Sequence, residues 1–171
     1  MQPLRVGNSN LILKDRTMIK RMLCLAIVLY CLAPVWTFGQ SKASLGQSLG
    51  PLVTSLNSGE KNIGQMQLSM TFGQRETFFA TFIGGQSAVL AEVVSHVGEL
   101  DSIYSRMKSA EDKKLVRDIL DVRVTLAMEL IDANLSFLNE TLPKLSNAAL
   151  STEIRQVRDV MQKIQITLRS R

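Results

Sequence analysis

The chain has 171 residues and a formal net charge of +5, and 46% of its residues are hydrophobic but only 5% are aromatic. That length allows one domain with a modest core, and the low aromatic content favours packed helices over a sheet sandwich. The positive charge lies mainly at the N-terminus, because residues 1–39 hold five basic and one acidic side chains, whereas residues 40–171 hold fifteen and fourteen. This near balance removes the main argument for nucleic-acid binding.

The N-terminal 39 residues have the pattern of a secretory signal peptide. Residues 18–22 include two adjacent basic side chains, residues 23–32 form an apolar run, and small residues lie around Gly39, where we expect cleavage. Translation from Met18 would give a signal of ordinary length. The alternative is an uncleaved membrane anchor, because residues 22–39 contain no charge and are 18 residues long, near the lower limit for a bilayer span.

Both cysteines, Cys24 and Cys31, lie within this signal segment. A processed chain of residues 40–171 therefore has no thiol, which excludes a disulfide, a cysteine nucleophile and a cysteine metal site from it. We expect residues 40–171 to form a single helical-bundle domain in the periplasm or the extracellular space. If the signal is retained, the domain is instead anchored to a membrane.

The first part of this domain predicts a short helix and a loop. Leucines spaced by 4, 3 and 4 residues between Leu45 and Leu56 predict a short helix, and the turn residues of Asn57–Asn62 predict a loop after it. Apolar and polar residues then alternate over Met66–Phe72, which is the period of a strand. Since no partner strand follows, we expect this segment to extend the helix or to cover the bundle in an extended form.

Three long helices follow, and Pro143 ends the second of them. The first continues to Lys108, Ser109 is the expected N-cap of the second, and Ser146 or Ser151 is expected to cap the third. The second helix organises the prediction, because an apolar stripe runs along it and is expected to face the core. The stripe consists of Leu115, Ile119, Val122, Leu126, Leu130, Ala133 and Phe137, and is widened by Val116, Leu120, Ala127, Ile131 and Leu138.

The predicted fold is therefore all-α: an antiparallel helical bundle of three long helices and one shorter N-terminal helix, following a signal peptide. No constellation in the sequence predicts catalysis, a metal site or a cofactor. His96 is the one histidine, and a di-iron bundle needs two Glu-x-x-His motifs. The serines lack a second histidine or a nucleophile elbow to activate them.

An uncharged segment at residues 77–91 supplies the candidate contact surface. Its aromatic residues precede a pair of glycines that we expect to break the helix and to let the segment swing. Core packing also explains such a segment, but the aromatic groups exceed what a small bundle needs for its core, so we predict a surface for a protein partner or lipid. The candidate residues are Phe78, Phe79, Phe82, Gly84 and Gly85.

Together these patterns predict an exported, non-catalytic protein–protein or envelope interaction module. The alternative is a bundle that binds a small apolar ligand or haem, held between His96 and a core methionine. Self-association through apolar helix faces is a further outcome that the sequence leaves open.

Overall fold

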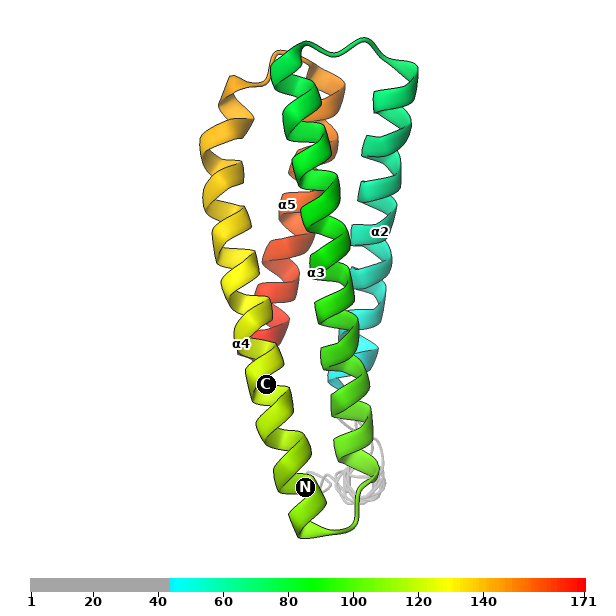
Figure 1. Ribbon diagram of the computed structural model, residues 1–171, viewed down its shortest axis with the longest axis vertical. Coiled ribbons are helices and arrows are strands. Elements are labelled where there is room, and N and C mark those ends of the chain that lie inside the picture. The colour runs from blue at the N-terminus through cyan, green and yellow to red at the C-terminus, as the bar shows by residue number, and fades with distance from the viewer. Residues whose placement is uncertain (1–43) are drawn as a thin grey trace, which may run out of the picture. The chain divides into compact units, whose positions relative to one another are not determined.

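The computed structural model describes residues 44–171, so the predicted signal and its cleavage site near Gly39 lie outside the described residues. Four α-helices pack against one another in this part of the chain, and successive helices run in opposite directions (Figure 1). They are α2 (Leu45–Ser69), α3 (Gln74–Arg106), α4 (Ala110–Thr141) and α5 (Ala148–Arg169), with a single 3-10 turn, η1 (Leu142–Lys144), after α4. The all-α prediction is confirmed.

Polar caps begin α4 and α5. The side chain of Ser109 accepts a hydrogen bond from the backbone N–H of Asp112, which confirms the predicted start of α4. At α5 the cap is Asn147, whose side-chain oxygen accepts from the backbone N–H of Leu150, and neither of the two serines predicted for this role provides the cap. Asparagine caps a helix at least as well as serine, so the residue type alone did not identify the position.

The α2 helix is much longer than predicted. It has 25 residues, against 22 for α5, and it runs without interruption through Asn57–Asn62, where a loop was expected. Leu56 lies just before this stretch and Ile63 just after it, and both are fully buried. Their burial outweighs the weak helix preference of the polar residues between them. The predicted shorter N-terminal helix is therefore wrong. Of the segment Met66–Phe72, the first four residues extend the helix as one alternative expected, whereas Met70 is the extended C-cap and the helix does not continue to Phe72.

The predicted break at Gly84 and Gly85 is also wrong, because α3 continues through both residues as one helix of 33 residues. Each glycine costs a helix about 1 kcal/mol relative to alanine. Ile83 and Leu90, which are fully buried beside the pair, each contribute about 1.5 to 3 kcal/mol by burial and keep the backbone helical.

The bundle has an aliphatic core to which all four helices contribute. Its largest fully buried side chains are Leu49, Leu56, Ile63, Ile83, Leu90, Leu120, Ile131, Leu138, Leu150, Ile154, Met161 and Ile164. Helix α2 lies against α3 and α5, and α4 lies against the same two helices from the other side. The closest approach of α2 to α3 involves two glycines, since a Cβ atom on Gly46 would lie only 2.9 Å from the carbonyl oxygen of Gly98.

The predicted register of α4 is wrong. The stripe of Leu115, Ile119, Val122 and Leu126, expected in the core, is 37% to 68% exposed. The buried residues are those predicted to widen it, including Leu120, about 100° around the helix from Ile119. Two apolar sets share one periodicity here, and the positions of the neighbouring helices decide which set is covered.

The start of α4 has fewer neighbours than the rest of the helix. The guanidinium of Arg171, at the end of α5, pairs with the carboxylate of Asp121 at 2.8 Å, so α5 ends level with this turn of α4. The turns of α4 before Asp121 therefore pack on α3 alone among the described helices, which leaves the outer side of Leu115 and Ile119 uncovered.

Candidate functional site

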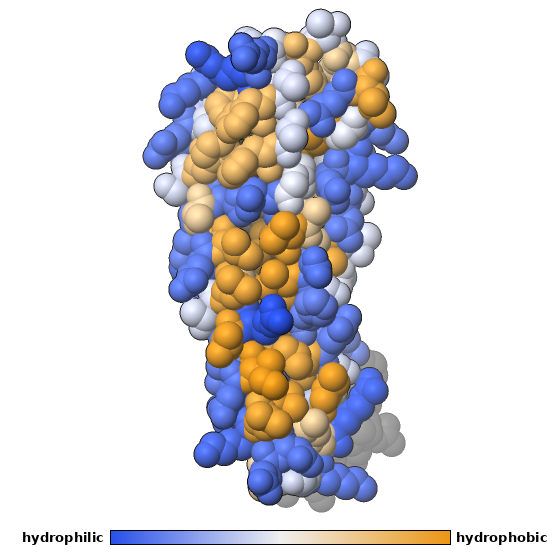
Figure 2. Space-filling view, in the orientation of Figure 1, coloured by the Kyte–Doolittle hydropathy of each residue, from blue (hydrophilic) through white to orange (hydrophobic). Residues whose placement is uncertain are grey.

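A continuous apolar surface on α3 and α4 is the main candidate for a functional site. Ten large hydrophobic residues are exposed in the described part of the chain, and seven of them belong to these two helices. The seven are Phe78, Val89 and Ile103 on α3, and Leu115, Ile119, Val122 and Leu126 on α4. We call them the α3–α4 face. Figure 2 shows hydrophobic residues in a band along this side of the bundle, interrupted by a hydrophilic group in its lower half.

Helical periodicity aligns these residues into two neighbouring rows. On α4 the steps between Leu115 and Leu126 are 4, 3 and 4 residues, and on α3 the steps from Phe78 to Ile103 are 11 and 14, which are close to three and four whole turns. Contacts between α3 and α4 set the pairing, since the rings of Phe82 and Phe137 lie 4.6 Å apart. Since α3 and α4 run in opposite directions, the row from Leu126 to Leu115 lies beside the half of the α3 row that ends at Ile103.

An aromatic cluster forms one end of this surface. The ring of Phe78 stacks on Phe82 with centroids 6.1 Å apart and meets the edge of Phe79 at 5.6 Å. Phe79 and Phe82 both contact Phe137 of α4, at 5.7 and 4.6 Å. Phe78 is 58% exposed, whereas Phe79 and Phe82 are half-buried. Of the three predicted contact residues, Phe78 thus lies on the surface, and the other two mainly hold α3 against α4.

The two glycines of the predicted site differ in position. Gly85 is exposed, three residues after Phe82 and four before Val89, and so it belongs to the same row. A Cβ atom there would have no neighbour within 4 Å, so this position faces open space. Gly84 is half-buried and lies about 100° away around the helix, outside the row.

Acidic side chains border the α3–α4 face. The exposed carboxylates one helical turn from its residues are Glu92, Glu99, Glu111, Asp112, Asp118 and Glu129. The exposed basic residues at the same spacing are Arg75, Arg106 and Arg123, and the first two lie at the ends of α3. None of the six carboxylates forms an ion pair with another described residue. The apolar seam therefore runs between unpaired acidic groups, with Arg123 as the one arginine along its middle.

The interior of the bundle offers no comparable site within residues 44–171. Every buried side-chain nitrogen and oxygen of the described residues has a hydrogen-bond partner, and no three metal-ligating side chains come together there. Asn134, which is buried, donates to the backbone carbonyl of Leu130 at 2.8 Å. His96 is exposed, whereas Met161 is fully buried in the core, so this pair cannot clamp a haem between them.

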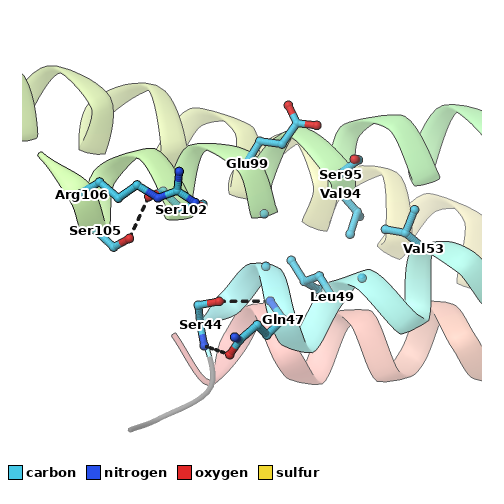
Figure 3. Close-up of a pocket in the computed structure, with 13 residues that line it drawn as sticks. Ser44, Gln47, Leu49, Val53, Val94, Ser95, Glu99, Ser102, Ser105 and Arg106 are labelled. Carbon is cyan, nitrogen blue, oxygen red and sulfur yellow. Dashed lines mark hydrogen bonds between the residues drawn. The ribbon is translucent and has the colours of Figure 1, made fainter.

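An open groove of about 600 Å³ lies along the start of α2 and the end of α3 (Figure 3). Several of its polar groups bond to one another. Ser44 and Gln47 form the reciprocal cap of α2, and Arg106 donates to the hydroxyl of Ser102 at 3.0 Å. These groups satisfy one another, and the carboxylate of Glu99, which also lines the groove, is one of those that border the α3–α4 face.

No protein-family model, curated protein or solved structure matches this chain. Among the described helices, α3 is long and apolar enough to cross a membrane, and 39% of its most apolar 18-residue window is buried inside the bundle. Core helices of soluble proteins have the same composition, since their buried side must be apolar. What remains to indicate a function is the surface of the bundle and the chemistry of the residues on it.

Proposed function

We propose that this chain is an exported helical-bundle protein that acts as a non-catalytic protein–protein interaction module, with the α3–α4 face as its contact surface. The continuity of that face carries the proposal. From Phe78 to Ile103 it spans 25 residues of helix, or about 38 Å at 1.5 Å per residue. Monomeric soluble proteins seldom expose a continuous apolar surface of more than a few hundred Å², and larger ones commonly bind a partner.

The composition of the face favours binding over chemistry. Its seven residues are aliphatic or aromatic, and the carboxylates around it are exposed to solvent. An apolar centre surrounded by charged side chains is the usual anatomy of a protein interface. The alternative of a small apolar ligand or haem gains less support, because the described core is one cluster of mainly aliphatic side chains from all four helices.

Export is supported by the basic and apolar pattern of residues 18–32 and by the small residues near Gly39. We expect the exported protein to begin close to Gln40 and to lack both cysteines. N-terminal sequencing and intact-mass measurement of protein recovered from the periplasm or the culture medium check this. A recovered chain that still contains Cys24 would instead establish the membrane-anchored form.

The contact surface is tested with Val122→Ser, because Val122 is 68% exposed and its replacement leaves the core intact. Ile166→Ser is the matched control, since Ile166 is 67% exposed but lies on α5. We expect crosslinking to the natural partner to fall by roughly tenfold for Val122→Ser and to stay unchanged for Ile166→Ser, with the thermal midpoint of both variants preserved. Equal crosslinking by the two variants would show that the face is not the contact surface.

The aromatic end of the face needs a different probe. Phe79 and Phe82 contact Phe137, so their replacement by serine would weaken the α3–α4 packing as well as the surface. Phe78→Ser is the suitable substitution, because its ring lies mostly in solvent. If Phe78→Ser behaves like Val122→Ser, the binding surface extends to the predicted aromatic segment.

A further inference from the structure

We infer that the occupant of the α3–α4 face is an amphipathic helix whose apolar stripe is flanked by lysine or arginine side chains. This inference rests on the proposed function and identifies the chemistry of the partner. The first supporting observation is shape. Exposed apolar residues of α3 and α4 border one seam, with His96 also exposed in the α3 row between Val89 and Ile103, and a helix laid along such a seam buries its own apolar stripe against them.

The length of the face sets the length of its occupant. A helix that follows the seam from the level of Phe78 to that of Ile103 needs about 25 residues, since both helices rise by 1.5 Å per residue. Gly85 lies on this path, and it adds no side chain that would hold a partner helix away from the surface. Phe78 and the rings behind it provide an aromatic end against which the helix can stop.

Charge determines what flanks the partner's apolar stripe. Six exposed carboxylates and three arginines lie three or four residues, or one helical turn, from a residue of the face, although residues 44–171 as a whole hold fourteen basic and fourteen acidic side chains. The acidic excess is thus local to this surface. Glu92 and Glu99 border it on the α3 side, and Asp118 and Glu129 border it on the α4 side. A partner helix with basic residues on both flanks places a positive charge beside the carboxylates along each edge of the α3–α4 face.

The same charges disfavour the two other occupants that an apolar face suggests. In a two-fold dimer each face meets its own copy, so the acidic borders of one copy would lie close to those of the other. An anionic membrane surface attracts basic residues and repels carboxylates. Arg123 alone along the middle of the seam does not reverse either effect, because carboxylates lie on both sides of it.

Two synthetic peptides test the inference. Each is ~25 residues long, which is the length that the helical rise gives for the seam. Both carry leucine at the spacing of one apolar stripe, but one has lysine on its flanks and the other has glutamate. We expect the full chain to bind the lysine peptide at least ~10-fold more tightly than the glutamate peptide, and raising the salt from ~0.05 to ~0.5 M to reduce that difference. Isothermal titration calorimetry and fluorescence anisotropy measure both affinities. Equal affinities, or no binding of the lysine peptide, would overturn the inference.

Charge-reversal variants place the binding on this face. Glu99→Lys combined with Asp118→Lys should lower the affinity for the lysine peptide and raise the affinity for the glutamate peptide. Glu60→Lys on α2 should change neither affinity. Val122→Ser should weaken both peptides, because it reduces the shared apolar contact. An unchanged peptide preference in the double variant would refute a role for these carboxylates.

Two further measurements separate the outcomes. Sedimentation velocity of the full chain should show a monomer, and vesicles of phosphatidylcholine with phosphatidylglycerol should not bind it. A dimer that Val122→Ser disrupts would identify a second copy as the occupant of the face. A vesicle complex that Val122→Ser disrupts would identify a lipid surface as the occupant. If Val122→Ser abolishes crosslinking to the natural partner but the lysine peptide does not bind, the proposed function stands and the basic helix is wrong. If neither the crosslink nor the peptide depends on Val122, both are wrong.

Discussion

Two leucines on one helix should differ sharply in their contribution to stability. Leu120 is fully buried, whereas Leu115, five residues earlier on α4, is 62% exposed. Leu120→Ala should lower the free energy of unfolding by about 2 to 5 kcal/mol, since it removes buried methyl groups and leaves a cavity. Leu115→Ala should cost about 1 kcal/mol or less, because burial of a whole leucine is worth about 1.5 to 3 kcal/mol and more than half of this side chain remains in water.

The measurement is urea denaturation followed by circular dichroism at 222 nm, with both variants compared at one protein concentration. Each kcal/mol should lower the thermal midpoint by roughly 3 to 6 °C for a domain of this size, so the two variants separate clearly in a melt as well. Leu126→Ala provides an intermediate case, because that residue is 37% exposed. If Leu115→Ala proved as costly as Leu120→Ala, the face would be covered in solution and the register of α4 described above would be incorrect.

Two further predictions concern the helix contacts. Gly46→Ala should destabilise the bundle by about 1 to 3 kcal/mol, because its Cβ would press on the backbone of Gly98, whereas the control Gly64→Ala has open space and should be neutral or stabilising by up to about 1 kcal/mol in the same denaturation assay. The hydroxyl of Ser146 donates to the carboxylate of Glu76 and lowers the pKa of that group, so Ser146→Ala should raise the Glu76 pKa in an NMR titration. Because the pKa of Glu76 is lower in the folded state than in the unfolded chain, its ionised carboxylate stabilises the fold. This stabilisation is present above the unfolded-state pKa and is lost as the pH falls through the folded-state pKa. An unchanged Glu76 pKa in Ser146→Ala would exclude the hydrogen bond as the cause of the lowered pKa.

The sequence by itself determined the fold class and several helix boundaries. Apolar residues at helical spacing give an amphipathic stripe whatever lies next to it, and a cap such as Ser109 acts through its own side chain on the following turn. Both are local properties. The uncharged aromatic segment was also identifiable, because its composition is visible without coordinates, and Phe78 does lie on the surface.

Only the tertiary structure decided which apolar residues are covered. On α4 both Leu120 and Ile119 continue helical patterns, and their burial differs because packed helix lies on one side of this part of α4 and solvent on the other. The same holds at Gly84 and across Asn57–Asn62, where local preferences for a break or a loop gave way to the burial of neighbouring residues. Local chemistry acts within a turn or two of helix, whereas burial depends on residues far away in the chain, so the candidate face appeared only when the helices were packed.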